Sequence, residues 1–163
     1  MKEHPMKPLP KPQRDLASST GSLPDGGFAP LVPELDVTDI GASRRFWCDL
    51  LGFSVAYDRP AAKFAYLQRQ GAQIMLCQIN GNWDTGPLER PFGRGINFEI
   101  KVDDVAPIAA ALEAAAWPLF RPLADIWYRI GESQESGARE LLVQDPDGYL
   151  VRLSQNIGTR AAA

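Results

Sequence analysis

Two glutamates, Glu34 and Glu99, are the carboxylates whose spacing could support chemistry. Glu34 lies in "PELDVTDI" (33–40) and Glu99 in "INFEIKVDDV" (96–105), and the two stretches align at an offset of 65 residues. If they form equivalent strands, the two carboxylates could face each other and hold a cation or an amine. The alternative is that both side chains face solvent or make structural hydrogen bonds.

The residues needed for nucleophilic catalysis are missing. The only histidine, His4, lies near the N-terminus, outside the regular part of the chain, so a Ser-His or Cys-His pair is not expected. Cys48 and Cys77 are too few for a disulfide framework and are typical of free thiols in a cytosolic protein. The stretch "GPLERPFGRG" lacks the lysine spacing of a phosphate loop.

The composition indicates one globular domain. The 163 residues are 45% hydrophobic and 23% charged, enough for a sizeable core. The formal net charge of −3 argues against a nucleic-acid partner. The chain has neither an apolar run long enough for a membrane span nor a signal-peptide pattern, so we expect a cytoplasmic protein without membrane contact.

The elements that would position the glutamates begin near residue 31. Residues 1–30, rich in Pro, Ser and Gly, are predicted to be a disordered extension. "LVPELDV" predicts a strand, and the helix that follows has Asp39 as its cap and ends at Gly52. Its apolar stripe consists of Phe46, Trp47, Leu50 and Leu51. "FSVAYDR", "KFAYLQR" and "AQIMLCQI" predict three further strands, which gives a β-α-β-β-β unit.

The second half repeats this plan. "INFEIKV" predicts a strand and "DVAPIAAALEAAAW" a helix with Pro107 in its first turn. "PLFRPL", "WYRIGE", "ARELLVQD" and "GYLVRLSQ" predict strands, the last two joined by a "DPDG" turn. "GAQIMLCQ" aligns with "GYLVRLSQ" at an offset of 77, so the second unit has the longer middle. We therefore predict an α+β domain (31–158) of two paired β-α-β-β-β modules, about 31–80 and 95–157, whose curled sheets surround a cleft, and a flexible tail (159–163).

Three stretches resemble the vicinal-oxygen-chelate superfamily, which includes glyoxalase I, extradiol dioxygenases, fosfomycin-modifying enzymes and bleomycin-resistance proteins. They are "VTDIGASRRFWCDLLGFSV", "FAYLQRQGAQIML" and "ARELLVQDPDGYLVRL". The resemblance covers about residues 31–157. It is most similar to the bleomycin-resistance branch, through "VPELDVTD", "FWCDLLGFS" and "GAREL" ahead of "DPDG".

The resemblance also implies four positions where metal-dependent members hold ligands. Here they are occupied by Val32, Met75, Asn97 and Arg152. None is a good donor for a divalent ion, and a guanidinium repels one. We therefore expect no metal or other cofactor and no catalysis. The alternative is a glyoxalase- or dioxygenase-like enzyme that binds metal through unexpected carboxylates such as Glu34 and Glu99.

In the bleomycin-resistance branch, the resemblance implies a homodimer with exchanged N-terminal strands and aromatic residues that sandwich the flat, cationic part of the drug. Pro33 aligns with the proline about which the strand is exchanged, and Phe64 with a groove phenylalanine. Gly137 stands where close relatives carry a groove tryptophan, which Trp127 or Trp83 could replace.

The expected function is therefore sequestration of a small molecule, such as a bleomycin-type glycopeptide antibiotic. A binder of another aromatic or amphipathic small molecule is a further alternative. Trp83 and Phe92 lie in the polar connection "NGNWDTGPLERPFGRG", where a rim contact would explain them. The candidate ligand-binding residues are Phe64, Tyr66, Trp83, Phe92, Phe98, Glu99, Trp127, Tyr128 and Arg152.

Overall fold

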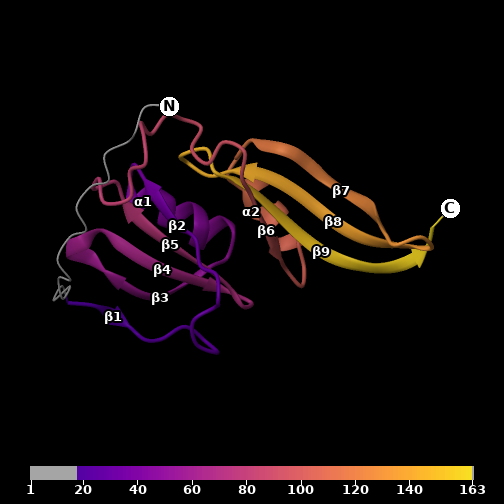
Figure 1. Ribbon diagram of the computed structural model, residues 1–163, viewed down its shortest axis with the longest axis horizontal. Coiled ribbons are helices and arrows are strands. Elements are labelled where there is room, and N and C mark those ends of the chain that lie inside the picture. Colours follow the sequence, from indigo (N-terminus) through magenta and orange to yellow (C-terminus); the bar gives the residue numbers. More distant parts are fainter. Residues whose placement is uncertain (1–17, 163) are drawn as a thin grey trace, which may run out of the picture.

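The computed structural model describes residues 18–162, which form two curled sheets that lie side by side along the long axis of the molecule (Figure 1). The first sheet has the strand order β1-β3-β4-β5-β2 and the second β6-β9-β8-β7. Neither sheet closes on itself. The predicted α+β class with two β-α-β-β-β modules is confirmed.

The first module supplies sheet A. Its strands are β1 (Thr20–Gly21), β2 (Glu34–Val37), β3 (Ser54–Arg59), β4 (Phe64–Arg69) and β5 (Ala72–Gln78). Between β2 and β3, α1 (Ile40–Arg44) continues as the π-helical turn η1 (Arg45–Leu50), and the 3₁₀ turn η2 (Pro60–Ala62) precedes β4. As predicted, Asp39 caps α1 by accepting a hydrogen bond from the Ala42 amide (2.8 Å). Gly52 ends the helical segment at a φ of +71°.

The second module supplies sheet B from β6 (Asn97–Lys101), β7 (Leu119–Ile130), β8 (Gln134–Gln144) and β9 (Leu150–Ala161), with α2 (Ala106–Ala114) after β6. The predicted strands "PLFRPL" and "WYRIGE" are one continuous strand, β7, because two β-bulges near its start absorb its irregular residues. β9 continues to Ala161 rather than ending before 159, because it pairs with the whole of β8.

The internal repeat is visible in the strand register. β2 pairs with β5 in parallel, placing Glu34 opposite Met75, and β6 pairs with β9 in parallel, placing Glu99 opposite Arg152. The separations are 99 − 34 = 65 and 152 − 75 = 77, the offsets of the sequence alignment. The two pairs therefore occupy equivalent places.

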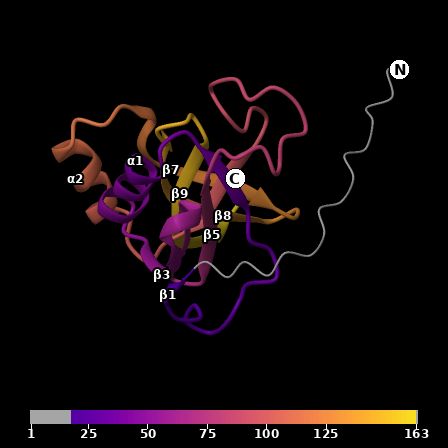
Figure 2. The same ribbon diagram turned by 90° about the vertical axis from the view of Figure 1, so that its left-hand side faces the viewer.

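One core joins the two modules. Helical residues such as Phe46 and Trp47 belong to one cluster of buried side chains that also contains Leu76 from sheet A and Leu153 from sheet B. Figure 2, viewed along the long axis, shows α1 and α2 together on one side of the sheets. Since the helices cover one face of each sheet, a site can lie on the opposite, helix-free face.

The segment before β2 differs from the prediction of a disordered extension. Residues 1–17, including His4, lie outside the described part of the chain. Residues 20–30, however, are placed against sheet A, where β1 pairs with β3 and the Ser22 amide donates to the Ala56 carbonyl (2.9 Å). The Pro33 carbonyl accepts a hydrogen bond from the Met75 amide of the same chain (2.8 Å). Strand exchange about Pro33 stays a prediction.

Candidate functional site

The helix-free faces of the two sheets form the candidate site. Alternation along the strands turns Leu35, Leu67 and Leu76 toward the helices and their neighbours toward the open side. On sheet A the open face consists of Glu34, Asp36, Phe64, Tyr66, Met75 and Cys77.

Aromatic rings line the open face of sheet A. Tyr57 stacks on Tyr66 with ring centroids 5.0 Å apart and an interplanar angle of 18°. Phe64 lies 6.0 Å from Tyr57, and the Arg59 guanidinium sits 3.9 Å above the Phe64 ring. We call Tyr57, Phe64 and Tyr66 the aromatic wall. Such a wall suits a flat, conjugated ligand.

Carboxylates flank this wall. Burial raises the pKa of Glu34, against the effect of a hydrogen bond that the Trp83 indole donates to it. Burial and the nearby charge of Asp84 raise the pKa of Asp36, which is 8% exposed. This edge of the face is therefore acidic, and a positive charge placed there would relieve the cost of burying the carboxylates.

On sheet B, the equivalent position holds an ion-pair network. The Arg152 guanidinium lies 2.7 Å from Glu99 and 3.8 Å from Glu140, and Lys101 lies 2.5 Å from Glu99. The Tyr128 hydroxyl donates to Glu140 (2.8 Å). Although burial favours the neutral acid, the hydrogen bond from Lys101 and the charge of Arg152 lower the pKa of Glu99. Burial and the Glu140 carboxylate raise the pKa of Tyr128.

A small hollow of about 200 Å³ opens over this network. It is lined by Asn97, Phe120, Arg121, Tyr128, Glu140, Leu142, Leu150 and Arg152. Glu140 is only 5% exposed at its floor. The hollow therefore combines one buried carboxylate with a guanidinium and an aromatic ring.

These residues do not fit the divalent metal that the resemblance implies for related enzymes. Val32 and Met75 offer a hydrocarbon and a thioether, and the Arg152 charge is paired with Glu99. Across residues 18–162, no three His, Cys, Asp or Glu side chains gather closely enough to hold a metal ion.

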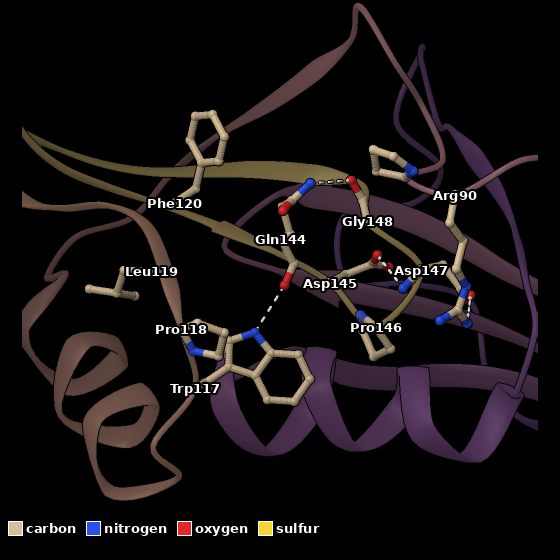
Figure 3. A pocket seen from close by; sticks show the side chains of 11 residues that line it. Arg90, Trp117, Pro118, Leu119, Phe120, Gln144, Asp145, Pro146, Asp147 and Gly148 are labelled. Atoms are coloured by element: carbon tan, nitrogen blue, oxygen red, sulfur yellow. Dashed lines mark hydrogen bonds and ion pairs between the residues drawn. The ribbon is translucent and has the colours of Figure 1, made fainter.

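A larger hollow lies elsewhere, at the end of the sheets near the β8–β9 turn (Figure 3). Its volume is about 860 Å³, and Trp117 and Phe120 form part of its wall. Arg90 reaches into this region and binds the buried Asp147 (2.7 Å) and the Thr38 hydroxyl (2.7 Å). Because Phe120 also lines the hollow on sheet B, the two hollows are adjacent.

The predicted ligand-binding residues lie in different environments. Phe64 and Tyr66 belong to the aromatic wall, Trp83 is 63% exposed beside Glu34, and Tyr128, Glu99 and Arg152 form the network on sheet B. Six of the nine predicted ligand-binding residues therefore lie on or beside the two open faces.

The other three lie away from these faces. Phe92 is 6% exposed and packs edge-on against Tyr149, so it is not a rim residue in this structure. Phe98 also contacts Tyr149, on the core side of β6. Trp127 lies on the opposite face of β7 from Tyr128, with its ring against Gly137 and beneath the Arg160 guanidinium (4.1 Å).

Sequence reasoning missed Tyr57, Glu140 and Phe120. Tyr57 could have been found from its alternation with Val55 in "FSVAYDR", but a bulge between Val55 and Tyr57 changes which face it occupies. Phe120 follows a proline in a segment whose register is set by bulges. Glu140 lies two residues before Leu142, which pairs with Arg152, so the side chains of all three residues share the helix-free face and line the hollow.

Comparison with known families now identifies the fold. The family model described as the glyoxalase/bleomycin resistance protein/dioxygenase superfamily matches residues 31–153. The chain belongs to this superfamily. No curated protein matches it.

Several solved structures are similar to this chain. A superfamily member from Vibrio splendidus 12B01 is 37% identical, over 76% of this chain and 95% of its own, with a TM-score of 0.37. TioX from Micromonospora sp. ML1 is 22% identical over 80% of this chain and all of its own, with a TM-score of 0.61. TnmS3, an antibiotic binding protein from Streptomyces sp. CB03234, is 19% identical over 77% and 93%, with a TM-score of 0.52.

Proposed function

We propose that this superfamily member is a non-catalytic binding protein that sequesters a flat, cationic small molecule, such as a bleomycin-type antibiotic, in the cytoplasm. The observation that carries the proposal is the stacked Tyr57–Tyr66 pair beside the acidic edge of Glu34 and Asp36. A conjugated ring can stack on the wall while its positive charge lies near the carboxylates. Sequestration requires no nucleophile and no metal.

The comparisons support a role in small-molecule binding but do not identify the ligand. The superfamily name includes bleomycin resistance proteins, and TnmS3, which shares the fold, is named as an antibiotic binding protein. No helix among the described residues is long and apolar enough to cross a membrane. The free thiols of Cys48 and Cys77 suit a reducing compartment.

We further propose that the protein acts as a homodimer, with strand exchange about Pro33. Apolar side chains remain uncovered along β7, including Phe120 (54% exposed), Ile126 (37%) and Ile130 (46%). A second copy would cover this strand and close the open sheets into a deeper pocket. Light scattering at micromolar concentration should give twice the chain mass, and an Ile126→Lys/Ile130→Lys variant should give the single chain mass.

The ligand proposal is tested by calorimetric titration of metal-free bleomycin. We expect saturable binding near one drug per chain, weakened about fivefold by either Tyr57→Leu or Glu34→Gln, because each variant loses a contact of about 1 kcal/mol. Asp125→Asn, on the opposite face of sheet B, is the control. Absence of heat with bleomycin, together with binding of another aromatic compound that depends on Tyr57, would replace the drug and keep the binding role.

A further inference from the structure

Residues 23–31, which we call the strap, cross the open face of sheet A. The family model begins at residue 31, so nearly all of the strap is an addition to the superfamily domain. The strap contains neither helix nor strand, and it follows the two-residue β1 that fixes its beginning to β3.

Two glutamine side chains hold the strap in place. The Gln73 side chain, 6% exposed, accepts a hydrogen bond from the Ala29 amide (2.8 Å) and donates one to the Gly27 carbonyl (2.7 Å). Gln68 accepts from the Asp25 amide (2.6 Å) and donates to the Asp25 carboxylate (3.2 Å). The strap is therefore attached by side-chain amides rather than by a strand ladder.

The strap covers the aromatic wall. Phe28 packs on Tyr66 with ring centroids 5.6 Å apart and an interplanar angle of 68°. The Tyr66 hydroxyl donates to Gln73 (2.6 Å), so the residue that holds the strap also holds the covered ring. Tyr66 is only 2% exposed, between the stacked Tyr57 ring and the edge-on Phe28 ring, and a ligand cannot take the place beside Tyr66 while Phe28 occupies it.

Several features of the strap favour its movement away from the sheet. Its three largest apolar side chains are poorly buried, with Leu23 67%, Phe28 58% and Leu31 85% exposed, although Pro24 is buried, so opening would cost the strap little of its own apolar burial. Gly27 has a φ of +86°, and no neighbouring atom lies within 4 Å of where its Cβ would be. A segment held by a few side-chain hydrogen bonds opens more readily than the sheet beneath it.

We propose that the strap is a lid that occupies the ligand's place on Tyr66, with Phe28 as an intramolecular substitute for the ligand ring. An aromatic ligand binds the wall when the strap leaves it. This inference rests on the proposed binding function and adds that the chain carries its own competitor, outside the superfamily domain.

The first test measures opening without ligand. Hydrogen–deuterium exchange of the full chain should show the amides of Asp25 and Ala29 exchanging at least tenfold faster than those of β4 and β5, because the strap opens while the sheet stays folded. Equal protection of the strap and the sheet would mean that the strap belongs to the core, and the lid would be rejected.

The second test measures binding of metal-free bleomycin to the full chain and three variants. Gln68→Ala/Gln73→Ala releases the strap, Phe28→Ala removes the competing ring and keeps the hydrogen bonds, and Leu88→Ala, an exposed loop side chain (42%), is the control. We expect at least fivefold tighter binding by the first two and no change for the control. If the double variant does not fold, the affinity of the Phe28→Ala variant alone tests the lid.

The outcomes separate the two proposals. Unchanged affinity in Phe28→Ala rejects the lid and leaves the binding function standing. Weaker binding also rejects the lid, because Phe28 would then be part of the ligand's own wall. No binding by the wild type or any variant removes the bleomycin-type function, and the lid with it.

Discussion

Asp145 is a buried acid at the start of the β8–β9 turn, 4% exposed. Burial raises its pKa to about 6, against hydrogen bonds from the amides of Tyr149 and Asp147 and from the Trp47 indole. A carboxyl whose pKa is higher in the folded than in the unfolded chain is stabilising when protonated. Its contribution is full below about pH 4 and is lost as the pH rises through 6.

We therefore predict that Asp145→Asn flattens the pH dependence of stability. Relative to the variant, the wild type should lose up to about 3 kcal/mol of unfolding free energy between pH 4 and pH 8, from about 1.4 kcal/mol per pKa unit. Urea titrations at both pH values measure this difference. Comparison with the variant is needed because the lowered pKa values of Glu99 and Asp125 act in the opposite direction. Parallel curves for the two proteins would contradict the assignment.

At the scale of elements, Asp147 joins three segments. Its carboxylate accepts hydrogen bonds from the Thr38 amide (2.9 Å) and hydroxyl (2.6 Å) at the end of β2, and pairs with Arg90 from the loop after β5. The Asp147 side chain is fully buried, whereas that of Arg90 is 58% exposed. The carboxylate is therefore the shared partner, and Arg90 is one of several groups that bind it.

We predict an unequal pair of substitutions at this junction. Asp147→Ala should cost about 3 kcal/mol, because it leaves the Thr38 groups without their acceptor, whereas Arg90→Ala should cost about 1 kcal/mol. Chemical denaturation of both variants provides the measurement. An Arg90 variant as damaging as the Asp147 variant would mean that the charge pair, rather than the bonds to Thr38, holds the junction.

The helices and strands also show which parts of the fold could be predicted from the sequence and which could not. Periodicity, the Asp39 cap and the two repeat offsets predicted the modules, because they depend on neighbouring residues. The fusion of two predicted strands into β7, the face of Tyr57 and the burial of Phe92 depend on bulges and on contacts with distant residues such as Tyr149. Local sequence patterns do not predict such contacts between distant residues.

At the scale of the whole molecule, the shared core predicts that the modules unfold together. Phe46, 1% exposed, packs on Trp117 of the second module with ring centroids 4.9 Å apart. Phe46→Ala should cost about 3–5 kcal/mol and accelerate hydrogen exchange in both sheets to the same extent. Faster exchange confined to sheet A would show that the modules are independent.

The contact between Trp127 and Gly137 limits which side chains the two positions can hold at the same time. A Cβ added at Gly137 would lie 2.9 Å from the Trp127 ring and 2.7 Å from Ile157, so a large side chain at 137 and an indole at 127 exclude each other. An aromatic side chain at 137 therefore fits this packing only if the indole at 127 and the Ile157 side chain move or are replaced, so these positions can change only together.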